Sequence, residues 1–194
     1  MNSKLLITGV GGSLDDISYS LNALTYVLNE LNKSGAETRL IDIKECNLPL
    51  FSYAKTRKTA KRDIKNFMDL LHTSDGLIFS SPEYHGTVSA AFKNFIDHLE
   101  YLSSYDPPYL TLKPIGCISL GGGDNSGIYT LNTLINIVHS LRGVTVSGNV
   151  AIPNAKNAFD EKGKLRNENI KRKLKRLAGD VYYVSSKLSI KSYN

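Results

Sequence analysis

The fold is decided by a pattern that residues 4–34 show in full: KLLITGVGGSLDDISYSLNALTYVLNELNKS. A short apolar run over residues 4–10 predicts a strand, and a loop rich in glycine and hydroxyl groups leads into a longer segment, residues 18–34. Leucines in that segment recur at steps of three and four residues, which places one apolar stripe on a helix. They are Leu21, Leu24, Leu28 and Leu31. Gly35 follows as a helix stop.

The same strand and helix unit recurs along the chain. Strands are expected over residues 4–10, 37–41, 76–80, 115–120 and 144–150, and helices over 18–34, 59–73, 89–101, 127–141 and 167–186. This alternation predicts an α/β fold in which helices cover both faces of a parallel sheet. Right-handed crossovers leave few arrangements. We therefore predict a flavodoxin-like three-layer sandwich with a five-stranded parallel sheet in the order 2-1-3-4-5.

Length and composition favour an ordinary globular protein. A chain of 194 residues, 41% apolar and 22% charged, is expected to form one domain over residues 1–194. Its first apolar run is quickly broken by glycines and does not resemble a signal peptide, and no run approaches the roughly 20 apolar residues of a membrane span. The two cysteines, Cys46 and Cys117, lack metal-ligand spacing. These features predict a cytoplasmic protein without a metal site.

The net charge of +6 is concentrated near the C-terminus, where eleven lysines and arginines and four acids lie from Ala155 onward. A nucleic-acid-binding patch on the last predicted helix is one interpretation. A solvated helix face is the other, and the lack of an accompanying aromatic ladder favours it. We therefore expect neither nucleic acid nor a membrane as a partner.

Ligands of open α/β sheets bind beyond the carboxyl ends of the strands, near the point where strand order reverses. The loop after the first strand, residues 8–18, reads TGVGGSLDDIS. Free backbone N–H groups and the positive end of the following helix dipole make such a turn suitable for a phosphate. It is neither a P-loop nor a Gly-x-Gly-x-x-Gly fingerprint. A purely structural turn with an Asp or Ser cap is the alternative.

The loop after the third strand, residues 80–89, reads SSPEYHGTVS. Tyr84 beside exposed backbone could form the wall that a flat aromatic ligand such as a flavin ring needs, and Gly86 would let the backbone approach it. Alternatively, Tyr84 packs on the next helix and His85 caps that helix. His85 has no nucleophile or carboxylate partner placed by sequence. We therefore predict no catalytic side chain.

Three consecutive glycines follow the fourth strand, in the loop SLGGGDNSG over residues 119–127. Ordering such a backbone is entropically costly, so a close approach to a ligand is favoured over a plain connection. A mobile surface loop is the alternative.

The residues SPEYHG at 81–86, followed by KNFIDHL at 93–99, resemble the signature of the NADPH-dependent FMN reductases, a flavodoxin-like family that includes azo, quinone and chromate reductases. Residues 112–116, 121–123, 150–153 and 158–165 are similar in the same order. The resemblance implies an oxidoreductase that passes hydride from NAD(P)H to bound flavin mononucleotide (FMN) and on to a small acceptor: a quinone, an azo compound or free flavin.

The resemblance also implies the cofactor-binding residues. The phosphate would bind at Gly12, Ser13, Ser18 and Ser20. The flavin ring would lie against Pro82, Glu83, Tyr84, His85 and Gly86, and it would be bordered by Gly121, Gly122 and Gly123.

The family usually carries an arginine where this chain has Asp15 and an asparagine where it has Ser20. Asp15 is expected to weaken FMN binding, unless it points to solvent or unless Asp15 or Asp16 caps the first helix. Family members commonly form dimers or tetramers, so a homodimer or homotetramer is expected. The tyrosine- and proline-rich residues 101–109 are one possible contact.

Two rival functions remain open. One is a flavin-binding electron carrier that does not oxidise NAD(P)H. The other is a flavodoxin-like scaffold that has lost FMN and works through protein contacts, since fold alone does not determine function.

Overall fold

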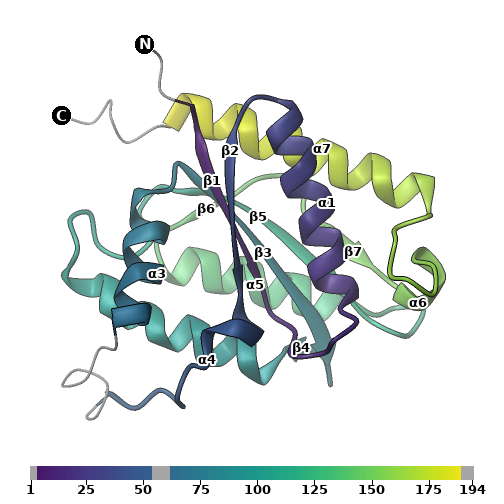
Figure 1. Ribbon diagram of the computed structural model, residues 1–194, viewed down its shortest axis with the longest axis horizontal. Coiled ribbons are helices and arrows are strands. Elements are labelled where there is room, and N and C mark those ends of the chain that lie inside the picture. The colour runs from purple at the N-terminus through teal and green to yellow at the C-terminus, as the bar shows by residue number, and fades with distance from the viewer. Residues whose placement is uncertain (1–3, 54–61, 189–194) are drawn as a thin grey trace.

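A twisted sheet with helices on both faces forms the centre of the molecule (Figure 1). The computed structural model describes residues 4–53 and 62–188. The main path of the sheet is β2-β1-β3-β5-β6, all parallel, with β7 also parallel to β5 and β4 antiparallel to β3. The strands are β1 Leu6–Gly11, β2 Glu37–Asp42, β3 Gly76–Tyr84, β4 Thr87–Val88, β5 Pro114–Leu120, β6 Val144–Thr145 and β7 Val150–Ile152.

The predicted flavodoxin-like fold and strand order are confirmed, with β5 as the predicted fourth strand. The predicted fifth strand, residues 144–150, is wrong as one element, because it divides into β6 and β7. Between the two pieces, Asn149 Oδ1 accepts the hydrogen bond of the Cys117 backbone N–H at 2.8 Å, so a side chain replaces the strand carbonyl there. A Cβ on Gly148 would lie 2.4 Å from Asp180 Oδ2, so a larger residue at this break would require the Asp180 side chain to move.

Alternate residues of the central strands face two separate cores. Ile78 of β3 packs in a core with helices α1 Tyr19–Lys33 and α7 Glu168–Leu188. Its neighbours Leu77 and Phe79 pack in a second core with α3 Arg62–Thr73, α4 Ala90–His98 and α5 Ile128–Ser140. This period of two is expected of a strand that is buried on both sides. It produces the three layers visible in Figure 1.

The helices follow the sequence prediction with local differences. The helix predicted over residues 89–101 ends as an α-helix at His98 and continues as a 3₁₀ helix over Leu99–Ser104. Of the helix predicted over 59–73, residues 59–61 lie outside the described residues. A 3₁₀ helix over Ile43–Cys46 and the short helix α6 Ala155–Ala158 were not predicted. Gly35 confirms the predicted stop, with φ +96° after α1.

The basic residues of α7 lie mostly on its exposed side, while Leu174 and Leu177 are buried against the sheet. Over residues 4–53 and 62–188, no helix has both the length and the apolar character that a bilayer crossing requires. Within the same ranges, no three His, Cys, Asp or Glu side chains gather where they could bind a metal ion.

Candidate functional site

A pocket of about 270 Å³ lies where β1, β3 and β5 end, at the predicted carboxyl edge. It brings together eight of the twelve predicted residues: Ser13, Ser18, Ser20, Pro82, Glu83, Tyr84, Gly121 and Gly122. Its other lining residues are Asp15, Ile17, Tyr19, Leu120, Ala155 and Lys156. The remaining predicted residues, Gly12, His85, Gly86 and Gly123, are not part of its lining. Three loops far apart in the sequence therefore share one cavity.

The start of α1 forms one end of this pocket. Ser18 is the N-cap, and its Oγ accepts from the Leu21 N–H at 3.1 Å. The N–H groups of Tyr19 and Ser20, in the first turn, have no carbonyl partner within the helix. Ser80 Oγ donates to the Ser20 carbonyl at 2.9 Å and fixes this turn to β3. Free N–H groups at a helix N-terminus suit a phosphate.

Gly12 lies beneath this turn. Its N–H donates to the Ser80 carbonyl at 2.8 Å, and its own carbonyl accepts from Ser89 Oγ. A Cβ here would lie 2.6 Å from the Phe92 ring, so the packing of α4 requires glycine. The predicted contact of Gly12 with phosphate stays a prediction that the pocket geometry does not favour.

Asp15 lies at the mouth of the pocket and does not cap α1, because Ser18 does. The alternative of an Asp cap is therefore wrong. The Tyr84 hydroxyl donates to Asp15 Oδ2 at 3.0 Å, and Ser13 Oγ lies 3.3 Å from the same oxygen. Burial, followed by the hydrogen bond to Asp15, raises the pKa of Tyr84. Asp16 points elsewhere and forms an ion pair with Lys44.

Residues 83–88 form a β-hairpin that was not predicted. Glu83 pairs with Val88 and Tyr84 with Thr87, which leaves His85 and Gly86 as a two-residue turn with φ of +51° and +79°. Positive φ at both positions matches a type I′ turn, for which Gly at the second position is favoured. Gly86 is therefore favoured by the turn, and a Cβ there would meet nothing within 4 Å.

The alternative in which His85 caps the next helix is wrong. Ser89, rather than His85, caps α4, since its Oγ accepts from the Phe92 N–H at 3.0 Å. Tyr84 remains about half exposed, and its hydroxyl donates to Asp15 of the first loop.

Glu83 has a role that sequence reasoning missed. Its Oε2 accepts from the N–H groups of Gly127 at 2.9 Å and Thr130 at 3.1 Å, at the start of α5. Gly127 is the N-cap of α5 and has no side chain to offer, so the carboxylate supplies the cap. The hairpin and the glycine loop are thereby joined.

The glycine loop is hydrogen-bonded to the end of β7 and to the start of α6, which disfavours the alternative of a mobile loop. Gly121 donates to the Ile152 carbonyl at 3.1 Å and accepts from the Ala155 N–H at 3.0 Å. A Cβ on Gly121 would lie 2.1 Å from the Ser126 Cβ, whereas one on Gly122 would meet nothing within 4 Å. Gly121 is thus required by packing, and Gly122 keeps the pocket wall open.

Tyr19, Ala155 and Lys156 line the pocket but were not among the predicted site residues. The last two come from α6, in the segment that connects β7 to α7. Phe159, just beyond α6, stacks on Tyr19 with ring centroids 4.9 Å apart, which holds this segment against the start of α1. The similarity of residues 150–153 and 158–165 to the family was a signal that this segment matters.

Neither cysteine is suited to act as a nucleophile. Both are free thiols. Burial raises the pKa of Cys46 to about 12 and raises the pKa of the fully buried Cys117 further.

Known proteins share both the sequence and the fold of this chain. It is 30% identical over 134 residues to an FMN-dependent NADPH-azoreductase from Staphylococcus haemolyticus (strain JCSC1435), covering 67% of this chain and 68% of the relative. It is 28% identical over 155 residues to an FMN-dependent NADPH-azoreductase from Staphylococcus aureus (strain USA300), covering 78% and 79%.

Two solved structures show the same fold. The flavoenzyme NAD(P)H:(acceptor) oxidoreductase FerB from Paracoccus denitrificans superposes with a TM-score of 0.76 at 20% identity, over 94% of this chain and 98% of that one. The apo form of an NADH:FMN oxidoreductase gives 0.73 at 19% identity, over 98% and 93%.

The sequence model of one family, described as NADPH-dependent FMN reductase, matches residues 5–157. This match confirms the oxidoreductase function and the FMN and nicotinamide cofactors expected from the SPEYHG and KNFIDHL motifs. The chain belongs to the family of NADPH-dependent FMN reductases.

Proposed function

We propose that this protein binds FMN in the pocket at the carboxyl edge and uses NAD(P)H to reduce a small azo compound, quinone or free flavin. The observation that carries the proposal is the convergence of a helix N-terminus, an aromatic side chain and a glycine wall on one cavity. A phosphate fits the helix N-terminus, and a flat ring fits the aromatic side chain and the glycine wall. The cavity is close to the lower end of the range usual for ligand sites.

Each side of the pocket has a distinct task. Ser18 and Ser20, with the first N–H groups of α1, hold and orient the phosphate end. Tyr84 supplies a flat wall, and Gly122 exposes backbone at the ring edge, next to the buried Gly121. Bound FMN supplies hydride acceptance and release, so the chain needs no acid or base side chain for that step. Its contribution is orientation and partial exclusion of water.

We further propose that a second copy of the chain covers the pocket mouth in a homodimer. Large apolar side chains are exposed on the elements around it: Leu14, Ile17, Tyr84, Ile128 and Tyr129. Exposed apolar patches of this kind commonly mark interfaces. Residues 101–109 are less suited, because the hydroxyls of Tyr105 and Tyr109 are bonded to Asp69 and Glu100. The free thiols fit a reducing compartment and support a cytoplasmic location.

The test is FMN uptake followed by turnover. Equilibrium dialysis at high micromolar FMN should give a yellow protein, and that protein should oxidise NADPH steadily when an azo dye or quinone is supplied. No FMN uptake would support the scaffold that has lost its cofactor. Uptake without NADPH oxidation would support an electron carrier instead.

A further inference from the structure

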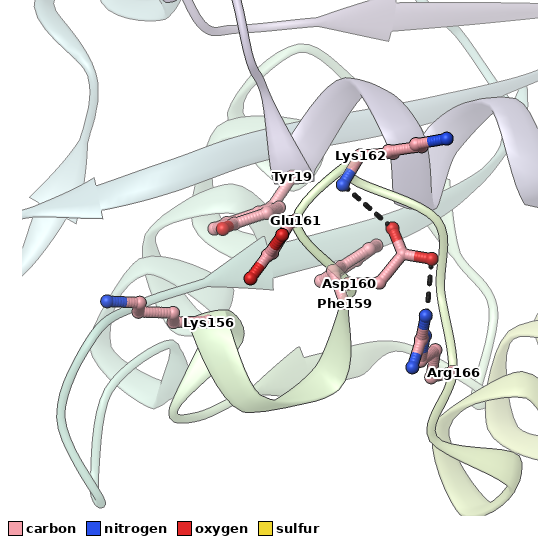
Figure 2. Close-up of a pocket in the computed structure, with 7 residues that line it drawn as sticks. All are labelled: Tyr19, Lys156, Phe159, Asp160, Glu161, Lys162 and Arg166. Carbon is pink, nitrogen blue, oxygen red and sulfur yellow. Dashed lines mark hydrogen bonds and ion pairs between the residues drawn. The ribbon is translucent and has the colours of Figure 1, made fainter.

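A larger hollow of about 610 Å³ adjoins the FMN pocket, and the two share Tyr19 and Lys156 (Figure 2). The hollow is lined mainly by charged residues of the segment after α6: Asp160, Glu161, Lys162 and Arg166. Lys156 therefore lines both the charged hollow and the pocket that contains the proposed phosphate turn.

Two of the charged side chains in the hollow, those of Asp160 and Arg166, form local contacts. Asp160 Oδ1 accepts from the backbone N–H groups of Lys162 at 3.0 Å and Lys164 at 2.8 Å, and Asp160 Oδ2 lies 3.2 Å from Arg166 Nε. The Lys164 hydrogen bond is the main cause of the lowered pKa of Asp160, and the Arg166 contact adds to it. Figure 2 shows the Lys156 side chain extending away from this pair. Lys156 forms no ion pair with any acid in the part of the chain that the structure describes.

The backbone beneath Lys156 is well anchored. Ala155 is buried, and its N–H donates to the Gly121 carbonyl. Ala158 is also buried, and the next residue, Phe159, stacks on Tyr19. Lys156 is thus held at a set place beside the N-terminus of α1, although its own side chain is exposed.

The proposed phosphate turn contains no cationic residue of its own. Residues 11–20 include Asp15 and Asp16 but no lysine or arginine. Asp16 is paired with Lys44, so Asp15 is the acid that would repel a phosphate of one to two negative charges. Lys156 is the one basic residue among the described residues that line the pocket.

We propose, on the basis of the proposed function, that Lys156 binds the FMN phosphate and offsets the charge of Asp15. It replaces, from a segment remote in sequence, the arginine that the family usually carries in the first loop. Lys156 acts here as a phosphate-binding and specificity residue, distinguishing phosphorylated flavin from riboflavin.

The test is a titration of the purified apoprotein with FMN and with riboflavin, followed by quenching of flavin fluorescence. Lys156→Met should raise the Kd for FMN about tenfold at low salt and leave the Kd for riboflavin within about twofold, because riboflavin has no phosphate. The loss should shrink as salt rises from about 20 mM to about 500 mM. Lys156→Arg should retain most of the affinity. Lys162→Met is the matched control, since Lys162 lines the adjoining hollow but not the FMN pocket.

The outcomes separate this inference from the function on which it rests. An unchanged FMN Kd in Lys156→Met would overturn the assignment of Lys156, and so would an equal loss for riboflavin or an equal loss in Lys162→Met. In each of these cases FMN binding by the parent protein, and thus the proposed function, stands. No FMN uptake by the parent protein would overturn both.

Discussion

The Tyr84 hydroxyl donates a 3.0 Å hydrogen bond to the Asp15 carboxylate, which joins the aromatic wall of the pocket to the proposed phosphate turn. Asp15 therefore lines the pocket while it remains exposed to solvent. The same carboxylate supports Tyr84 and opposes a bound phosphate.

Changing Asp15 should separate these two effects. At about 6 Å and an effective dielectric near 20, one unit of repulsion amounts to about 3 kcal/mol before screening and about 1 kcal/mol after it. Asp15→Asn, which keeps an acceptor for Tyr84, should tighten FMN binding about fivefold, and Asp15→Arg at least about tenfold. FMN titration at two salt concentrations measures both. Unchanged affinity in Asp15→Arg would mean that this turn does not hold the phosphate.

A substitution at Gly86 should act through the backbone conformation that it imposes and not through steric collision. Valine at φ +79° is strained by roughly 1–3 kcal/mol, so Gly86→Val should distort the hairpin and abolish FMN binding while circular dichroism shows an intact domain. Gly86→Asn is the matched control, because asparagine tolerates the left-handed region. It should bind FMN nearly as the parent does. Normal FMN affinity in Gly86→Val would place the ring elsewhere.

Gly121 and Gly122 should respond differently to alanine. A Cβ on Gly121 would collide with the Ser126 Cβ, so Gly121→Ala should lower the free energy of unfolding by roughly 1–3 kcal/mol. Gly122→Ala has open space and should stay within about 0.5 kcal/mol of the parent. Urea unfolding of both variants measures the difference. Equal stabilities would contradict the close packing of Gly121.

The burial of Lys113 leads us to expect that the free energy of unfolding depends on pH. It is almost fully buried, and its Nζ donates to the carbonyls of His72 at 2.7 Å and Ser74 at 2.6 Å. Burial lowers its pKa from the usual 10.5 to about 8, against an opposing effect of Asp75. Between those two pKa values the unfolded chain binds more protons than the folded one, so stability should rise with pH.

The measurement is urea unfolding at about pH 7.5 and about pH 9.5 of the parent protein and of Lys113→Met. Lowering of the pKa from 10.5 to about 8 corresponds to a gain of about 2 kcal/mol in the free energy of unfolding over this pH interval, in the parent relative to the variant. The comparison cancels groups that titrate in both proteins. Parallel pH profiles would show that Lys113 keeps an ordinary pKa in the folded protein.

Most of the fold could be predicted because its determinants are local. The leucine stripe of α1 and the apolar runs of β1, β3 and β5 are set by residues close in sequence. The division between β6 and β7 could not be predicted, because it depends on Asn149 bonding to Cys117 in another strand. The hairpin turn had only a weak sequence signal, since its glycine at position 86 suits a type I′ turn but His85 is not one of the residues favoured before it.

The three loops that form the site could be predicted, but the hydrogen bonds that join them could not. Eight residues meet in one pocket because parallel strands end at the same edge. The partners of Asp15 and Glu83 lie 69 and at least 44 positions away, and no local pattern indicates them. Lys156 is brought to the pocket by two long-range contacts, the hydrogen bond from Ala155 to Gly121 and the stacking of Phe159 on Tyr19.

Because Glu83 caps α5, the two sides of the pocket rim should differ in how easily they open. On one side a carboxylate binds two helix N–H groups, an arrangement stronger than a neutral hydrogen bond. On the other side, the exposed Tyr84 to Asp15 hydrogen bond joins the hairpin to the first loop. Amide hydrogen exchange should therefore be slow at Gly127 and Thr130 and fast over residues 14–17, so a ligand would enter and leave past the first loop.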